Sequence, residues 1–135
     1  MSGPKKVSQL DIRLSVNGDE HTVSKLIFEA FGPFRAEYTR DAFEYTAATP
    51  DVIRERFAEG PTWLAFDRSK PVGTVSGMPE EERYYIRSMA VSPEAQGCGV
   101  GQKLLETAEA DARKRGFKRL YLYTTFVLPA ARPLY

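Results

Sequence analysis

The chain has 135 residues, of which 42% are hydrophobic and 27% are charged, and its formal net charge is +1. This length fits one globular domain with a single core, and the balanced charge gives no electrostatic surface for nucleic acid or an anionic membrane. Cys98 is the single cysteine and His21 the single histidine, so an internal disulfide is excluded and a structural zinc site is not expected. We therefore expect a cytoplasmic protein that uses no metal.

The first half of the chain predicts a strand followed by helices. Residues 1–6 are predicted to form a disordered tail, and residues 10–16 alternate apolar and polar side chains with a period of two, as a half-buried strand does. One apolar helix face is predicted next from the spacing of Val23, Leu26, Ile27, Ala30 and Phe31. A further helical piece is predicted around residues 39–46. Thr49 followed by Pro50 is typical of the start of another helix.

The second half predicts most of a sheet around one more helix. The strand-like runs are residues 62–66, 72–76, 84–91 and 117–124, the first two joined by a polar turn at 67–70 that is typical of a hairpin. Between the last two runs lies an amphipathic helix that starts at about Val100 and is capped by Gly116. This order predicts a mixed α/β (α+β) domain, with a largely antiparallel central sheet flanked by helices.

A glycine-rich segment with the sequence Q-G-C-G-V-G, residues 96–101, joins the 84–91 run to this helix. A helix start offers unpaired backbone N–H groups and the positive end of the helix dipole, so such a turn is typical of an anion site. A dinucleotide fingerprint would need a third glycine where Gln102 stands. A triphosphate loop needs a lysine between a glycine and Ser or Thr, whereas Lys103 precedes Leu104. The spacing that fits is Q-x-x-G-x-G, which fills the whole segment.

With the strand before it and the helix after it, this motif resembles the acetyl-CoA-binding motif of the GNAT N-acetyltransferase superfamily. The resemblance covers most of the chain, and it implies a single GNAT domain over residues 7–135 that takes acetyl-CoA as its cosubstrate. The strand backbone before the loop would pair with pantetheine, and the loop and first helical turn would receive the pyrophosphate. The residues so implied are Met89, Ala90, Val91, Gln96, Gly97, Cys98, Gly99, Val100, Gly101 and Gln102.

The resemblance also implies groups that move protons. Family members supply a proton from a tyrosine in a helix after the fifth strand, in a segment ending roughly A-x-x-L-Y. Residues 130–135 match that segment, with Tyr135 as the candidate acid, although Pro133 inside such a helix costs about 3 kcal/mol unless it lies in the first turn. A carboxylate near the start of the fourth strand can act as base through water, which points to Glu82. A backbone N–H near Met89 is implied as the donor to the oxyanion.

The family usually continues beyond this tyrosine through a helix and two more strands. The resemblance therefore implies a C-terminally truncated domain whose sheet lacks the usual last two strands. Such a sheet has an exposed edge, which a partner subunit such as a second copy of the chain could cover.

Two further expectations concern the 84–91 run. One of Tyr84 and Tyr85 should face the site while the other packs beneath a helix, and the sequence does not distinguish them. Arg87 is expected to share a strand face with Met89 and Val91, where it either contacts substrate or pairs with an acid.

The predicted function is transfer of an acetyl group from acetyl-CoA to a primary amine, which attacks the thioester directly. The acceptor is an amine of a small molecule or of a peptide, and the short chain favours the small molecule. Neither nucleic acid nor a membrane is expected as a partner. The alternatives are a non-catalytic acyl-CoA-binding module and a truncated, inactive GNAT fragment.

Overall fold

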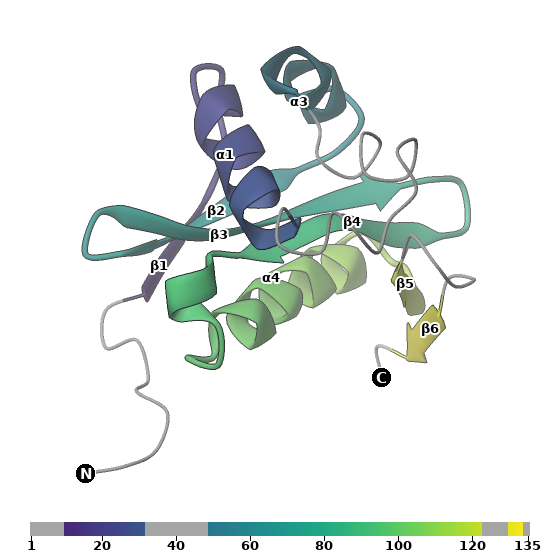
Figure 1. The fold of residues 1–135 in the computed structure, drawn as a ribbon. Helices are drawn as coiled ribbons and strands as arrows, with labels where there is room; N and C mark the ends of the chain where they lie inside the picture. Colours follow the sequence, from purple (N-terminus) through teal and green to yellow (C-terminus); the bar gives the residue numbers. More distant parts are fainter. Residues whose placement is uncertain (1–9, 32–48, 123–129, 134–135) are drawn as a thin grey trace, which may run out of the picture.

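The computed structural model describes residues 10–31, 49–122 and 130–133 (Figure 1). Its strands are β1 (Leu10–Leu14), β2 (Thr62–Asp67), β3 (Lys70–Pro79), β4 (Tyr84–Val91), β5 (Arg119–Leu122) and β6 (Ala130–Pro133). Its helices are α1 (Glu20–Phe31), α3 (Pro50–Phe57) and α4 (Val100–Lys114), with a short 3₁₀ turn, η2, at Pro93–Ala95. The predicted fold class, a mixed domain around a largely antiparallel sheet, is confirmed.

The six strands lie in sequence order, β1-β2-β3-β4-β5-β6, and every neighbouring pair except β4 and β5 is antiparallel. Parallel neighbours need a crossover between them, and α4 supplies it. The glycine-rich segment therefore lies where the chain leaves the sheet to make this crossover.

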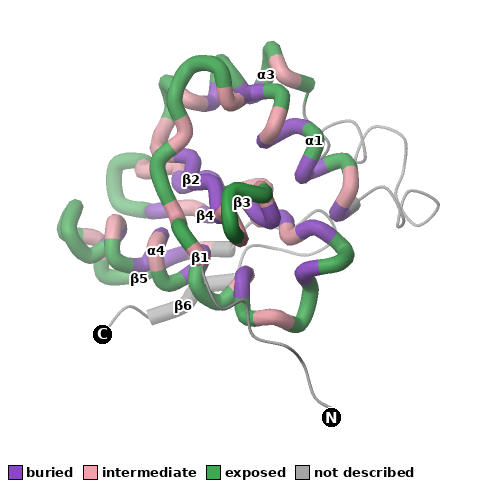
Figure 2. Tube along the Cα trace, turned by 90° about the vertical axis from the view of Figure 1, so that its left-hand side faces the viewer, coloured by how far each residue is buried: buried purple, intermediate pink, exposed green. Residues whose placement is uncertain are grey.

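Helices cover both faces of the sheet. α1 and α3 lie on one face and α4 on the other, which is visible in Figure 1 and in the buried core of Figure 2. On the α1 face, Ile27 and Ile53 pack against Leu64 of β2. On the α4 face, Val100 and Leu104 belong to the larger core cluster, which also contains strand residues of β2, β3, β4 and β5. Val100 and Leu104 are fully buried, and their packing fixes the start of α4 against the sheet.

The ends of α1 and α3 are joined by polar contacts. The Thr49 hydroxyl accepts from the Val52 backbone N–H and caps α3, as its sequence predicts. Arg54 of α3 donates to Glu20, the first residue of α1, at 2.7 Å, and Glu20 is buried. The pKa of the Glu20 carboxyl is lowered, first by a hydrogen bond from its own backbone N–H and then by the Arg54 guanidinium.

Because its folded pKa lies below its ordinary value of 4.5, Glu20 contributes stability at neutral pH that is lost as the pH falls through the folded pKa. We expect Glu20→Gln to lower the free energy of unfolding at pH 7, and we expect its difference from the unsubstituted protein to be smaller at pH 3 than at pH 7. Urea unfolding at both pH values measures this difference. Glu29→Gln is the control, because the ion pair described for Glu29, with Lys25 at 3.9 Å, is exposed. If Glu20→Gln lowers the free energy of unfolding equally at both pH values, the ion pair with Arg54 is not the cause of the loss.

Strand β6 corrects one prediction. The stretch 130–135 is expected to be helical, but Ala130–Pro133 form a strand that pairs antiparallel with β5. Proline disfavours a helix interior and is tolerated on an edge strand, and β6 is the outermost strand of the described sheet, where Pro133 pairs with Arg119. The predicted tail at 1–6, the helical piece around 39–46 and Tyr135 lie outside the described residues.

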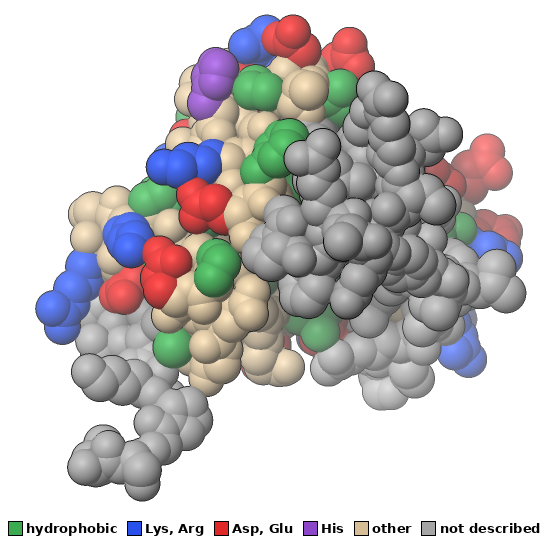
Figure 3. All heavy atoms as spheres, in the orientation of Figure 1, with side chains coloured by type: hydrophobic (Ala, Val, Ile, Leu, Met, Phe, Trp, Pro, Cys, Tyr) green, Lys and Arg blue, Asp and Glu red, His purple; other side chains and the backbone are tan. Residues whose placement is uncertain are grey.

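The surface mixes both signs of charge. On the face shown in Figure 3, acidic and basic side chains alternate over the described part of the molecule, in keeping with the net charge of +1. Among the helices described, none is long and apolar enough to cross a lipid bilayer.

Candidate functional site

Strand β4 contains a bulge just before its last residues. Thr74 of β3 pairs with Ala90, but Ser76 pairs with Arg87, so β4 has one residue more than β3 in this interval. Ser88 has a φ of 58°, which is uncommon for a residue with a side chain. The extra residue shifts the alternation of side chains along the strand.

The shift reverses one expected placement. Arg87 and Ser88 both point to the α3 side, because Arg87 donates to Glu59 at 2.9 Å and the Ser88 hydroxyl accepts from Arg56 at 3.0 Å. Met89 and Val91 instead pack against the α4 core. The prediction that Arg87 shares a face with Met89 and Val91 is therefore wrong, because regular alternation was assumed where a bulge occurs.

The backbone of β4 beyond the bulge presents an edge. The described ladder between β4 and β5 holds only the three residues from Tyr84 to Ile86. The Ser92 N–H donates to Val72 of β3, so the backbone groups of Met89 and Val91, which alternate with those of Ala90 and Ser92, point to the other side. The Val91 carbonyl there accepts from the Gln96 side chain at 3.2 Å. An extended ligand could pair with this edge as an added strand.

The glycine-rich segment brings the start of α4 next to that edge. Gly97 and Gly99 have φ values of 83° and 88°, a region that favours glycine, and the N-cap of α4 is Gly99 itself. No side chain caps this helix, and its first turn holds no acidic residue, in contrast to α3 with its Thr49 cap. The N–H groups of residues 99–102 have no partner within the helix, whose first donor is Lys103 to the Gly99 carbonyl at 3.1 Å. Four donors and the positive dipole end therefore converge at one point.

Gly73 on β3 explains how closely α4 approaches the sheet. A Cβ at this position would lie 2.9 Å from side-chain atoms of both Val100 and Leu104. At Gly101, by contrast, there is space for a side chain. The nearest atom to an added Cβ would be on Val91, at an ordinary van der Waals distance of 3.7 Å. The protein itself therefore leaves room for a side chain at Gly101, and this room lies beside both the helix start and the strand edge.

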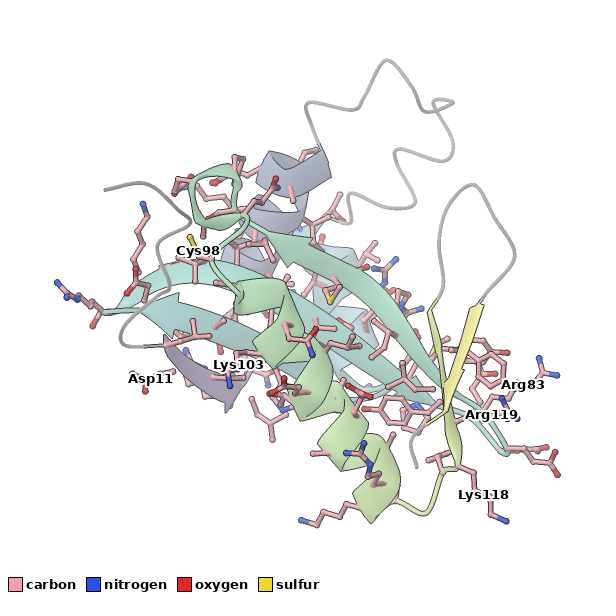
Figure 4. All side chains as sticks on the ribbon, turned by 90° about the horizontal axis from the view of Figure 1, so that it is seen from below. Asp11, Arg83, Cys98, Lys103, Lys118 and Arg119 are labelled. Carbon is pink, nitrogen blue, oxygen red and sulfur yellow. The ribbon has the colours of Figure 1, made fainter. Side chains whose placement is uncertain are left out.

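Cys98 lies on the loop before α4, as Figure 4 shows. Its Sγ is 4.0 Å from the Gln96 carbonyl, and the residue is partly exposed. No histidine or acid is seen to activate it among the contacts described, so it has the place of a small loop residue. The described residues contain no group of three or more His, Cys, Asp or Glu that could hold a metal ion.

The two tyrosines of β4 are now distinguished. Tyr84 is completely buried beneath α4 and donates to Asp111 at 2.7 Å. Burial, then the neighbouring Asp111 carboxylate, raises the pKa of Tyr84 far above its ordinary value. Tyr85 lies beside its pairing partner Tyr121, with ring centroids 5.7 Å apart, and its hydroxyl accepts from Arg83. Tyr84 therefore supports α4, and Tyr85 is the tyrosine on the opposite face.

Glu82 is not brought to the bulge. It is exposed in the turn between β3 and β4, seven residues before Met89, which corresponds to roughly 20 Å along an extended chain. Figure 4 shows its neighbour Arg83 at the end of the sheet away from Cys98. The structure thus brings together Met89–Val91 and the glycine-rich segment, but not Glu82.

A family model, that of the acetyltransferase (GNAT) family, matches residues 24–135. The chain belongs to the GNAT acetyltransferase family. The match includes α4, the glycine-rich segment and all of β2, β3 and β4, so the resemblance predicted from the loop motif is confirmed.

Individual relatives match parts of this GNAT chain. A peptidyl-lysine N-acetyltransferase of Escherichia coli, YjaB, is 34% identical over 68 residues, which are 48% of this chain and 42% of that protein. An amino-acid acetyltransferase of Ralstonia nicotianae is 43% identical over 47 residues, 35% of this chain and 10% of that protein. The chain therefore aligns with less than half the length of either curated relative.

Solved structures agree on the fold. A GNAT family acetyltransferase from Brucella melitensis, determined in complex with acetyl-CoA, has a TM-score of 0.70 at 23% sequence identity. The similarity covers 86% of this chain and 76% of that one. At this identity the comparison supports the shared fold.

Proposed function

We propose that this GNAT protein transfers the acetyl group of acetyl-CoA to a primary amine. One observation carries the proposal: the backbone edge of Met89–Val91 lies next to the uncapped start of α4. A pyrophosphate needs several N–H donors and no obstructing side chain, which residues 99–102 offer. The pantetheine amides need an open strand edge, which the bulged end of β4 offers.

The chain's own groups have defined tasks in this reaction. The neutral amine nitrogen bonds to the thioester carbonyl carbon and gives up one proton to water, the carbon–sulfur bond breaks, and the thiolate takes up a proton. We propose that the Met89 N–H, on the free side of β4, stabilises the oxygen that becomes negative in the transition state. The edge and the helix start position the thioester, which lowers the entropic part of the barrier. We assign Glu82 no role in this proposal, because it lies in the turn before β4, seven residues from Met89.

The acceptor is proposed to be a small amine. The two curated relatives are named for peptidyl-lysine and for amino acids, so primary amines are common to both. The test combines calorimetric binding of coenzyme A with thiol release from acetyl-CoA across a panel of amines. Binding with turnover supports the proposal. Binding without turnover for any amine would favour a non-catalytic acyl-CoA-binding module, and no binding would contradict both.

Tyr135 remains the proposed proton donor to the departing thiolate. We expect Tyr135→Phe to lower kcat at least about tenfold, since general acids contribute 10²–10⁴-fold in favourable cases, with an unchanged Kd for coenzyme A. Steady-state thiol release and calorimetry measure the two quantities. Tyr121→Phe on β5 is the matched control. An unaltered kcat in Tyr135→Phe would remove this residue from the mechanism.

A further inference from the structure

The α3 side of the β4 bulge carries a second cluster of polar groups, made of Arg56, Glu59, Arg87 and Ser88. Arg56 is 7% exposed, and the Arg87 side chain is 13% exposed. Two guanidinium groups are thus held close to the bulge and largely away from water. Removing a charged group from water costs free energy unless the group is hydrogen-bonded or paired with an opposite charge. Two largely buried guanidinium groups beside one bulge therefore point to a functional role.

Arg87 is incompletely bonded. Its Nη2 donates to Glu59 at 2.9 Å, but its Nε is buried and has no hydrogen-bond partner among the described residues. Carboxylates bind arginine best through two parallel N–H···O bonds. Glu59, whose side chain is 47% exposed, accepts one described hydrogen bond from Arg87 and not the parallel pair. The unused Nε–H is a donor for a second acceptor.

The position of Arg87 relates this donor to the transfer reaction. Arg87 is two residues before Met89 along the chain, with only the bulge residue Ser88 between them. The proposed coenzyme site lies on the β4 edge and at the start of α4, and the proposal below places the amine on the opposite, α3 side of β4. The bulge turns both Arg87 and Ser88 to that face. An amine that approaches Met89 from there passes the guanidinium of Arg87.

We propose that Arg87 binds a carboxylate of the acceptor, so that the substrate is a small amine that carries its own carboxylate, such as an amino acid. The inference rests on the proposed function, and it names the class of acceptor. Ser88 and Arg56 hold the bulge that aims Arg87, and Glu59 occupies part of its fork until the substrate arrives. A peptidyl lysine, whose amine is distant from any free carboxylate, would make no use of this donor.

The test compares amines in pairs that differ only by the carboxylate: L-alanine with ethylamine, L-leucine with isopentylamine, and L-lysine with 1,5-diaminopentane. A lysine peptide with blocked ends serves as the peptidyl acceptor. For each compound, calorimetric binding to the protein saturated with coenzyme A and kcat/KM for thiol release are measured. The ratio within a pair, compared between variants, cancels differences in amine basicity.

We expect the unsubstituted protein to prefer the carboxylated member of at least one pair. Arg87→Gln should reduce that preference at least tenfold, mainly through KM, and Arg87→Lys should restore part of it. Glu59→Gln should change the preference in the opposite direction, because it frees the fork for the substrate. Arg13→Gln is the control for loss of an arginine–carboxylate pair elsewhere, since Arg13 of β1 pairs with Asp19 at 2.8 Å, although its side chain is more exposed than that of Arg87. It should leave the preference unchanged.

Several outcomes overturn the inference. One is the absence of any preference for carboxylated amines in binding or turnover, and another is a preference for the blocked peptide. A third is equal loss in Arg87→Gln and Glu59→Gln, which is the result of a purely structural ion pair. Coenzyme A binding in the same samples separates the two proposals. Its absence in the unsubstituted protein contradicts the proposed function, whereas its presence without carboxylate preference contradicts this inference alone.

Discussion

Gly101→Val is expected to weaken coenzyme A binding at least tenfold, or roughly 1.4 kcal/mol, in a protein that still folds. Gly101 is in the first turn of α4, and the nearest atom to an added Cβ is 3.7 Å away on Val91. The fold therefore accepts a side chain at this position, and glycine in a helix is itself unfavourable by up to about 1 kcal/mol. A valine would instead occupy the space beside the four N–H groups that have no partner within the helix.

Calorimetry measures the Kd, and a thermal melt confirms the fold. Ala110→Val is the matched control, because Ala110 is exposed on the same helix and lies more than two turns from its start. It should lose some helix stability and no affinity. An unchanged Kd in a folded Gly101→Val protein would refute the assignment of the pyrophosphate to this helix start.

Gly77→Ala is expected to destabilise the protein by about 1–3 kcal/mol, the usual range for overpacking. An added Cβ would overlap the Tyr84 hydroxyl oxygen and lie 2.7 Å from the ring carbon that carries it. Tyr84 has no room to withdraw, because it is fully buried, bonded to Asp111 and packed edge-on against Phe117. Urea unfolding gives the loss. Gly101→Ala adds the same methyl group where there is room, and it should not destabilise.

A double-mutant cycle identifies the cause of this loss. Tyr84→Phe alone should cost about 1 kcal/mol for the hydrogen bond to Asp111, which keeps its contact with Arg115 at 2.7 Å. Since phenylalanine lacks the hydroxyl that an alanine at position 77 would strike, the double variant should lose less than the sum of the single losses. Full additivity would mean that the two groups do not meet.

The elements that were predicted well are those in which local chemistry agrees with packing. Thr49 and Pro50 predict the start of α3, which the structure confirms. The apolar residues of α4, predicted from their spacing, form its buried face. The β2–β3 hairpin was found, but its connection is shorter than the predicted four residues, because the strands extend to Asp67 and Lys70. Arg68 and Ser69 occupy the turn with positive φ values, although neither residue is typical of such a turn. The positive φ values are imposed by the pairing of β2 with β3. The sequence of the turn does not reveal this pairing.

The glycine-rich segment and the start of α4, to which the coenzyme is assigned by proposal, were predictable because a glycine spacing and a helix start are local features. The bulge at Ser88 was not, since its sequence contains no glycine and the extra residue exists only relative to β3. The same bulge decides which face Arg87 takes, so its contact with Glu59 could not be foreseen. The segment 130–133 is a strand because β5 offers it a partner. The A-x-x-L-Y pattern of residues 131–135 does not reveal that a neighbouring strand is available for pairing.

The open start of α4 has a consequence for how much of the chain is folded at a given coenzyme concentration. A helix whose first donors lack a cap is not stabilised by its own sequence at that end. If coenzyme A supplies the missing acceptors, binding and folding become linked, and a free concentration one hundred times the Kd adds about 2.7 kcal/mol to the free energy of unfolding. A larger supply of coenzyme would then raise the fraction of the protein that is folded as well as its rate of turnover.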